Sequence, residues 1–319
     1  MDRVSANANK NVIAIAITLS SIIHRGMIEP CLLIRSFMLS YQHAYHIGNH
    51  ADIIKHLILQ SVLQKLQQKA KPFTCIDTHA GEGVYAVNTD PSPQHNEYQT
   101  GVAPLLQGDF DSELLNTWQA QLHAHFAKGQ LPGSPWYIAM AMRETDQAHL
   151  VELHPQAYEA LTHNIDLPNL HTYCEDSFKA LRRLVPPLHR RGMVLIDPPY
   201  EDRFEYQLVS EAVTQALQKW ATASFLVWYP LLSQRSKQKS GLSEQMVSEL
   251  STSECKSVAD FRLTIATKDT ADIGMYGSGM LCINLPYGCF EAIRDALQEL
   301  VSTLGQNVNI SATWLREPD

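Results

Sequence analysis

The sequence predicts an α/β protein built on a mainly parallel, doubly wound sheet of seven strands, one of them reversed. Three observations support this fold class. Short apolar runs alternate with longer segments that carry apolar residues at helical spacing. A glycine-containing turn follows the first strand-like run, at the position where α/β sheets bind nucleotides. The chain has 319 residues, 45% of them hydrophobic, so it can bury one large core.

Composition limits the classes of function that the chain can have. The formal net charge of −8 argues against a protein that coats nucleic acid through its overall field. A nucleic-acid contact would need a local basic cluster, and the best candidate is Arg182, Arg183, Arg190 and Arg191. A turn before a strand lies at the sheet end opposite a cofactor, so a solvated loop remains the alternative. The six cysteines show no paired metal spacing, so we expect a reduced, cytoplasmic chain without a metal.

Residues 1–37 differ in character from the rest of the chain. Residues 12–23 form an apolar run, which is too short for the roughly 20 residues that a membrane-spanning helix needs. Basic residues ahead of this run leave the core of a signal peptide as an alternative. We expect a leader outside the functional fold, no membrane anchor, and a functional protein that begins at Met38.

The segment 38–84 is expected to supply an N-terminal motif, a helix and the first strand of the sheet. Asn49 is a suitable N-cap, and the apolar stripe after it predicts a helix that packs on the sheet. Residues 73–77 indicate a buried strand, and the turn 78–83 brings backbone close to a ligand through its glycines. This turn lacks the third glycine of a dinucleotide fingerprint, which counts against a dehydrogenase.

Histidines are frequent in this first segment. Those that could suggest a metal are His43, His46, His50 and His56. No cysteine joins them, and the change from turn to helix at Asn49 separates their side chains, so a metal site is not favoured. We expect instead that Tyr41 and His43 face a substrate, and that Lys55 and His56 lie near the carboxylate of a cofactor.

Residues 85–131 interrupt the alternation of strands and helices. They combine polar sequence rich in proline and histidine with one helical stretch, 111–127. We interpret them as an inserted helical subdomain on the substrate side, with a purely structural extension as the alternative. The main fold resumes over 132–319, where a Pro-Gly turn opens a helix that ends near residue 141.

Two further strands end in acidic residues. The strand 149–154 contains Glu152, and a carboxylate at this position typically binds the ribose hydroxyls of a nucleoside cofactor. The strand 170–174 is followed by Asp176, which could bind the adenine amino group of such a cofactor. Asp176 could equally be only the N-cap of a helix over 177–184.

The most informative stretch is the buried strand 193–196 with the Asp197-Pro198-Pro199-Tyr200 corner that ends it. Two prolines cannot donate to a ladder and fix their own φ, so the corner is stiff. An acidic residue, two prolines and an aromatic residue are typical of enzymes that methylate exocyclic amino groups. The carboxylate and a proline carbonyl can accept the two N–H bonds of adenine, which aims the nitrogen lone pair at a methyl donor while the aromatic ring stacks on the extruded base.

The remaining sequence completes the predicted sheet. A polar loop over 201–206 could meet nucleic acid, and a helix then runs to Trp220. Three more strands are expected at 224–230, 256–266 and 279–285, flanked by helices at 243–250 and 290–304. The total of seven strands, most separated by helices, is the layout of a Rossmann-like class I methyltransferase.

From Met38 onward the chain resembles the RlmJ family, which methylates an adenine amino group of bacterial 23S ribosomal RNA with S-adenosylmethionine. The matching pieces lie in 39–43, 48–56, 77–81, 132–135, 152–155 and 190–200. The resemblance implies a catalytic corner of Asp197, Pro198 and Tyr200 and RNA contacts by Tyr41 and His43. It also implies a set of cofactor-binding residues: Lys55, His56, His79, Gly81, Ser134, Glu152, Asp176, Ser177 and Asp197. The family commonly has glycine where this chain has Ser177, which weakens that one assignment.

The expected partner is 23S ribosomal RNA, protein-free or in an early assembly intermediate, bound by a monomer. Two other classes of function remain open. A DNA adenine-N6 methyltransferase would share the Asp-Pro-Pro-Tyr corner and would prefer duplex DNA over ribosomal RNA. A non-catalytic RNA-binding relative would keep the fold without the pocket, and failure to bind S-adenosylmethionine in calorimetry would identify it.

The sequence predicts that the leader is dispensable. Because the matching fold begins after Met38, a protein that starts there should keep its melting temperature and its methyltransferase activity. Differential scanning calorimetry and a methyl-transfer assay on both lengths check this. A large loss of either quantity would show that residues 12–23 contribute to the fold.

Overall fold

In the part of the chain that the structure describes, eight strands form one sheet in the order β10-β8-β9-β7-β6-β1-β4-β5, and β2 pairs with β3 in a separate two-stranded sheet. The structure, a computed structural model, describes residues 46–87, 97–268, 274–305 and 307–318. These residues all belong to one compact unit, which spans 41–319. The predicted leader 1–37, Tyr41 and His43 lie outside the described residues.

The large sheet is parallel through its centre and antiparallel at one side. The parallel strands are β1 (Thr74–Asp77), β4 (Gln147–Val151), β5 (Leu170–Tyr173), β6 (Gly192–Ile196) and β7 (Ser224–Leu232). The antiparallel pairs join β7 to β9 (Met275–Ile283), β9 to β8 (Val258–Thr264), and β8 to β10 (Asn309–Arg316). The predicted α/β class and the seven predicted strands are confirmed, and β10 is an additional edge strand.

Sequence reasoning missed β10 although a signal was present. Ile310, Ala312 and Trp314 alternate with polar residues, and these three are the partly buried apolar residues of the strand. The ring of Trp314 stacks on that of Phe290 with centroids 4.4 Å apart, which attaches the strand to the helix before it. No residue of β10 is fully buried, so the strand has no continuous apolar run and only its alternation indicates it.

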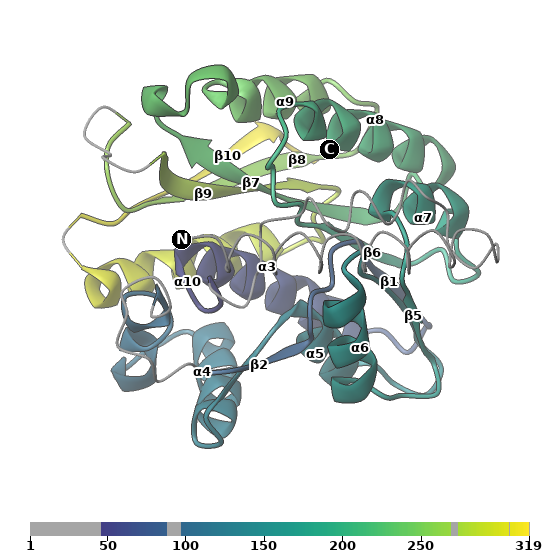
Figure 1. Cartoon of the computed structure of the whole chain (residues 1–319), viewed down its shortest axis with the longest axis horizontal. Coiled ribbons are helices and arrows are strands. Elements are labelled where there is room, and N and C mark those ends of the chain that lie inside the picture. The colour runs from purple at the N-terminus through teal and green to yellow at the C-terminus, as the bar shows by residue number, and fades with distance from the viewer. Residues whose placement is uncertain (1–45, 88–96, 269–273, 306, 319) are drawn as a thin grey trace, which may run out of the picture. The chain divides into compact units, whose positions relative to one another are not determined.

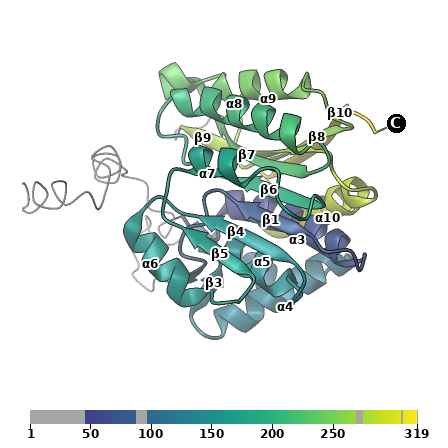
Figure 2. The ribbon, with the colours of Figure 1, turned by 90° about the vertical axis from the view of Figure 1, so that its right-hand side faces the viewer.

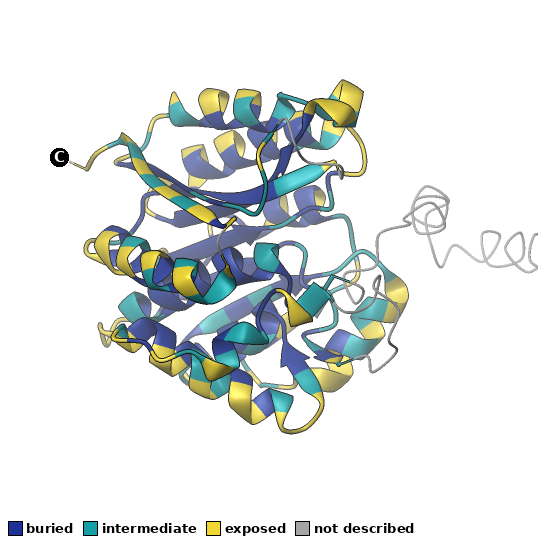
Figure 3. Cartoon of the chain, turned by 90° about the vertical axis from the view of Figure 1, so that its left-hand side faces the viewer, coloured by how far each residue is buried: buried dark blue, intermediate teal, exposed yellow. Residues whose placement is uncertain are grey.

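Helices cover both faces of the sheet, as Figures 1 and 2 show. One layer contains α3 (His50–Gln67), α5 (Ser134–Ala141), α6 (Pro155–Asn164) and α10 (Cys289–Leu304). The other contains α7 (Ser177–Leu184), α8 (Phe204–Lys219) and α9 (Leu242–Ser251). Figure 3 shows the result: the strands are largely buried, and the helices expose only their outer faces. No described helix is long and apolar enough to cross a membrane.

Helix α3 begins as predicted and is largely enclosed. The Asn49 side chain caps it by accepting hydrogen bonds from the N–H groups of Ala51 and Asp52. Its apolar stripe is fully buried, and three polar residues of the first turns are buried with it: Asp52, Lys55 and His56. Charged groups are rarely buried without partners, so these three side chains mark a site.

The described part of the segment between β2 (Val84–Ala86) and β3 (Gln130–Pro132) is mainly helical. It contains α4 (Glu113–Phe126), which matches the predicted helix, and two short 3-10 turns, η3 (Glu97–Gln99) and η4 (Pro104–Gln107). Trp118 of α4 is fully buried and donates a hydrogen bond to the hydroxyl of Tyr137, 2.8 Å away. The α4 helix therefore packs on the main fold, while its role as a substrate-side subdomain stays a prediction.

Gly192, at the start of the central strand β6, lies where no side chain fits. Its φ is +158°, and a Cβ added there would lie 1.8 Å from the carbonyl oxygen of Thr74 on β1. Gly129 also has positive φ, but nothing lies within 4 Å of its Cβ position. Both alanine variants carry backbone strain, and only Gly192→Ala must also push two central strands apart.

We therefore expect Gly192→Ala to destabilise the fold by about 3 kcal/mol more than Gly129→Ala, equivalent to about 6 °C in melting temperature. Thermal unfolding followed by circular dichroism measures both variants. Equal melting temperatures for the two would mean that β1 and β6 do not approach each other as described.

Candidate active site

A lysine ammonium joins helix α3 to the end of the central strand. Lys55 Nζ lies 2.5 Å from Asp197 Oδ2 and 2.7 Å from Asp52 Oδ1. Asp52 has no exposed surface and also accepts the N–H of Gly48 at 2.7 Å, while the side chain of Asp197 is 16% exposed. The His56 ring is buried on the same side, with Nε2 3.8 Å from Asp52 Oδ1. The site therefore contains one cation held by two carboxylates, one of which reaches the surface.

Electrostatics keep this lysine protonated. Burial alone would lower the pKa of Lys55, but Asp197 and Asp52 outweigh burial and hold the pKa well above its usual value. Removing either carboxylate would leave a buried charge without its partner, which typically costs about 3–5 kcal/mol. Two carboxylates of the chain already neutralise the Lys55 ammonium, and its expected place near a cofactor carboxylate stays a prediction.

A further carboxylate, Asp77, lies at the end of β1 in the same region. Burial, with a smaller contribution from Asp197, raises its pKa from 3.8 to about 6, against the lowering effects of the Ser134 hydroxyl and the His79 N–H. Its Oδ1 accepts the His79 N–H at 3.2 Å, whereas Oδ2 has no partner of ordinary hydrogen-bond geometry within the described chain. Asp77 is thus a buried acceptor with unused capacity at the carboxyl end of the sheet.

His79 is held as a neutral imidazole of one tautomer. Burial and, to a smaller extent, the Lys55 ammonium together lower its pKa to about 3. The hydroxyl of Thr78 donates to the carbonyl of Leu195 at 3.0 Å, so its oxygen accepts from His79 Nδ1 at 2.8 Å. Nε2 of His79 is therefore the acceptor nitrogen of the ring.

The glycine turn after β1 is tied to the end of β4. Gly81 has φ of +62°, and a Cβ there would lie 2.0 Å from the hydroxyl oxygen of Tyr85, so only glycine fits. Glu152 accepts the N–H of Gly81 at 2.8 Å through one oxygen and the N–H of His154 at 2.7 Å through the other. Burial raises the pKa of Glu152, an effect that these N–H groups oppose. The fold thus brings together Gly81 and Glu152, two of the predicted cofactor-binding residues.

Asp176 and Ser177 follow β5 at the same edge of the sheet. Asp176 is the N-cap of α7, and its Oδ1 accepts the N–H of Lys179 at 2.9 Å. The capping alternative is therefore confirmed, and a cofactor contact by the same side chain stays a prediction. Ser177 is buried in the first turn of α7.

Tyr200 lies differently from the expectation. Its φ of +49° turns the side chain inward, where only 2% of the residue is exposed. The hydroxyl donates to the carbonyl of Trp228 at 2.9 Å, and the ring packs on Tyr206 with centroids 4.4 Å apart. In this conformation the ring has almost no surface for an extruded base, so the predicted stacking role requires a different conformation of Tyr200.

The fold also brings to the site three residues that sequence reasoning did not select. Asp52 could have been found from its i,i+3 spacing to Lys55, and Asp77 from its place at the end of a buried strand. Lys239 had no local signal: its ammonium reaches the carbonyls of Tyr200 and Glu201 at 3.1 and 3.4 Å from a separate loop. Within the described ranges, no three His, Cys, Asp or Glu side chains could together hold a metal ion.

Comparisons with known proteins agree on one family. The profile of the family described as "Ribosomal RNA large subunit methyltransferase D, RlmJ" matches residues 70–316. The chain is 34% identical to ribosomal RNA large subunit methyltransferase J of Haemophilus influenzae and 33% identical to that of Escherichia coli. Each alignment covers 84% of this chain and 94% of the relative. A crystal structure of a Legionella pneumophila protein superposes with a TM-score of 0.73 at 28% identity, covering 84% of this chain and 98% of that one.

The raised pKa of Asp77 predicts a pH-dependent cost to the fold without cofactor. An acid whose folded pKa lies above its unfolded value favours folding below pH 3.8, and this contribution is lost as pH rises through about 6. The difference corresponds to about 3 kcal/mol. The melting temperature of Asp77→Asn minus that of wild type should therefore rise by about 5 °C between pH 4 and pH 7.

Calorimetry at several pH values checks this, with the exposed Asp109→Asn as control. The control difference should change little with pH. A flat difference for Asp77→Asn would contradict the burial of an ionisable Asp77.

Proposed function

The chain belongs to the RlmJ family of ribosomal RNA large subunit methyltransferases, and from that membership we propose that it methylates the exocyclic amino group of a specific adenine in 23S ribosomal RNA, with S-adenosylmethionine as methyl donor. The observation that carries the proposal is the Asp197 carboxylate, fixed by Lys55 at the end of the central strand and followed by two prolines. The proposed substrate is an RNA element that is protein-free or in early assembly, and the proposed form is a cytoplasmic monomer.

The residues at the carboxyl ends of β1, β4 and β5 fit a nucleoside cofactor. When bound, S-adenosylmethionine supplies an electrophilic methyl group. Gly81 leaves room for close backbone approach, Glu152 presents a carboxylate of the kind that binds ribose hydroxyls, and Asp77 has an unused buried acceptor. The other residues proposed to hold the cofactor are His56, His79, Ser134, Asp176 and Ser177.

Asp197 is proposed to act on the substrate base. The adenine amino nitrogen is a poor nucleophile because its lone pair is delocalised into the ring. The Asp197 carboxylate and the Pro198 carbonyl are proposed to accept hydrogen bonds from the two N–H groups of this nitrogen. These bonds favour a pyramidal nitrogen whose lone pair points at the methyl group. The methylated nitrogen is strongly acidic, so Asp197 need not be a strong base to receive the proton.

Lys55 is proposed as a positioning residue for Asp197. A carboxylate has about four lone-pair directions, so an ammonium on Oδ2 is compatible with an amino group that donates to the same carboxylate. Because Asp52 shares the ammonium, the carboxylate of Asp197 is oriented before substrate arrives, which reduces the cost of ordering it in the transition state. Tyr41 and His43 keep their proposed RNA contacts, and both lie outside the described residues.

Two variants separate chemistry from binding. Asp197→Ala should reduce methyl transfer about 100- to 1000-fold, equivalent to about 3–4 kcal/mol, while S-adenosylmethionine still binds. Glu152→Ala should weaken cofactor binding and leave turnover at saturating cofactor. Single-turnover methyl transfer to a 23S ribosomal RNA transcript and calorimetric titration of S-adenosylmethionine measure the two effects.

The assay should include duplex DNA at matched salt, because a DNA adenine methyltransferase would carry the same corner. Equal or faster methylation of DNA would favour that alternative class. If Asp197→Ala kept more than about a tenth of the wild-type rate at saturating cofactor and RNA, the assignment of Asp197 to catalysis would be wrong.

A further inference from the structure

The edge of the sheet opposite Asp197, where the parallel strands have their amino-terminal ends, is basic and free of acidic residues over four adjacent strands. The strands β9, β7, β6 and β1 are neighbours in the sheet, and four connections meet at this edge: 284–288, 220–223, 185–191 and 68–73. Together they contain Lys69, Lys71, Arg190 and Arg191, and no Asp or Glu. The whole chain has a net charge of −8, so the positive charge of these four connections differs from that of the chain as a whole.

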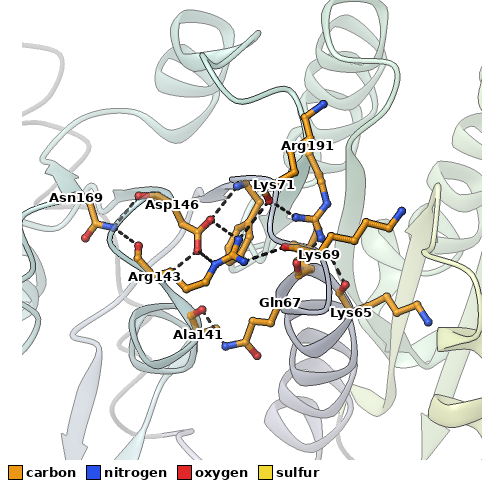
Figure 4. Close-up of polar contacts among 11 residues, drawn as sticks. Lys65, Gln67, Lys69, Lys71, Ala141, Arg143, Asp146, Asn169 and Arg191 are labelled. Carbon is orange, nitrogen blue, oxygen red and sulfur yellow. Dashed lines mark hydrogen bonds and ion pairs between the residues drawn. The ribbon is translucent and has the colours of Figure 1, made fainter.

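Two arginines hold the loop before β1 in place, as Figure 4 shows. Arg143 donates to the carbonyl oxygens of Lys69 and Lys71 at 2.9 and 3.3 Å and pairs with Asp146 at 2.8 Å. Arg191 donates to the carbonyl of Lys71 at 2.7 Å and to that of Leu66 in the last turn of α3. The loop is thus fixed through its backbone, which leaves the lysine side chains out of the network.

Both guanidinium groups also lie over the ring of Phe73, with Arg143 at 5.4 Å and Arg191 at 5.9 Å from the centroid. A structural role explains these two residues completely. Arg191 satisfies carbonyls at the C-terminus of α3, where a cation is favoured by the helix dipole, and Arg143 is neutralised by Asp146. The lysines need a separate explanation.

Lys69 and Lys71 have no such role. Across the described ranges, no Asp or Glu oxygen lies within 4.0 Å of the charged nitrogens of Lys65, Lys69, Lys71 or Arg190. In Figure 4 the side chains of Lys65 and Lys69 extend away from the guanidinium groups. These ammonium groups are therefore available to an external anion, on a loop whose backbone is already ordered.

Exposed apolar groups lie on the same connections. Tyr287 follows β9 and is 91% exposed, and Leu188 precedes β6 and is 80% exposed. Lys65, in the last turn of α3, has its Nζ 3.7 Å from the Cβ position of Gly288, the residue after Tyr287, so this ammonium group and the exposed tyrosine are neighbours. Cations interspersed with an exposed aromatic ring suit the phosphates and unstacked bases of RNA.

We propose that this edge, defined by Lys65, Lys69, Lys71, Arg190 and Tyr287, is a second RNA contact that binds the sugar-phosphate backbone of the ribosomal RNA away from the target adenine. The inference rests on the proposed function, since it assigns the surface to the same substrate. The surface ends at β4, where Glu144 and Asp166 appear on the neighbouring connections. A second contact at this surface adds a requirement on the substrate, because the RNA must extend beyond the element that enters the active site.

Geometry limits what can reach both edges. Strands of four or five residues span roughly 15 Å at about 3.3 Å per residue, and the loops add to this distance. A short hairpin that presents its adenine to Asp197 would leave the opposite edge empty. A long transcript could pass around the protein and bind both edges. The length of the RNA therefore decides whether the lysines contribute.

The test compares the double variant Lys69→Gln/Lys71→Gln with the double variant Lys128→Gln/Arg294→Gln, which removes the same charge elsewhere. KM and kcat are measured on a long 23S ribosomal RNA transcript and on a short hairpin with the target adenine. The lysine variant should raise KM for the transcript about 10-fold, with kcat unchanged, and reduce the slope of log binding constant against log salt by about 1.5. Its constants on the hairpin should match those of wild type.

An unchanged KM on the transcript, or equal losses on hairpin and transcript, would overturn the proposal. An equal effect from the control variant would also overturn it, because overall charge would then be the cause. Anisotropy of labelled transcript without cofactor keeps the test separate from catalysis. If wild type methylates neither RNA, the proposed function fails, while loss of transcript binding in the lysine variant alone would still support the surface.

Discussion

The shared ammonium of Lys55 is the contact on which the rest of the site depends. It connects Asp52, in the first turn of α3, with Asp197, at the end of β6, and so fixes a helix from the start of the fold against its central strand. Because these charges are buried, loss of either carboxylate would leave the ammonium without full compensation and would destabilise the fold. The apolar stripe of α3 supplies the packing that holds the lysine in this position, and the N-cap at Asn49 sets where the helix begins. The stability of the fold and the proposed catalytic geometry therefore depend on the same residues.

The corner after β6 is rigid for several independent reasons. Pro198 and Pro199 restrict the backbone, and Tyr200 is locked by its hydrogen bond to Trp228. Lys239 binds the carbonyls of Tyr200 and Glu201. Such a corner holds a carboxylate at a fixed point, which is what a reaction that depends on orienting a weak nucleophile requires. The buried Tyr200 ring shows that the same corner must rearrange if the ring is to stack on a base.

Sequence reasoning identified the fold because strands and helices leave local patterns. The apolar run 193–196, the glycine turn after β1 and the caps at Asn49 and Asp176 each depend on neighbours within a few residues. The pairing of Lys55 with Asp197 spans 142 positions and exists only once helix and sheet pack. The inward turn of Tyr200 results from a positive φ that a tyrosine seldom adopts. Long-range charge pairing and unusual backbone angles were therefore beyond local patterns, while residues 1–45 lie outside the part of the chain that the structure describes.

The central proposal is that this chain places one methyl group on an adenine amino nitrogen of the large-subunit ribosomal RNA. Mass-spectrometric mapping of N6-methyladenine in 23S ribosomal RNA, from cells with and without the protein, tests it most directly. We expect that one adenine loses its methyl group when the protein is absent, and that wild-type protein restores the methyl group while the Asp197→Ala variant does not. An unchanged methylation pattern in the RNA, or a loss confined to DNA, would contradict the proposal.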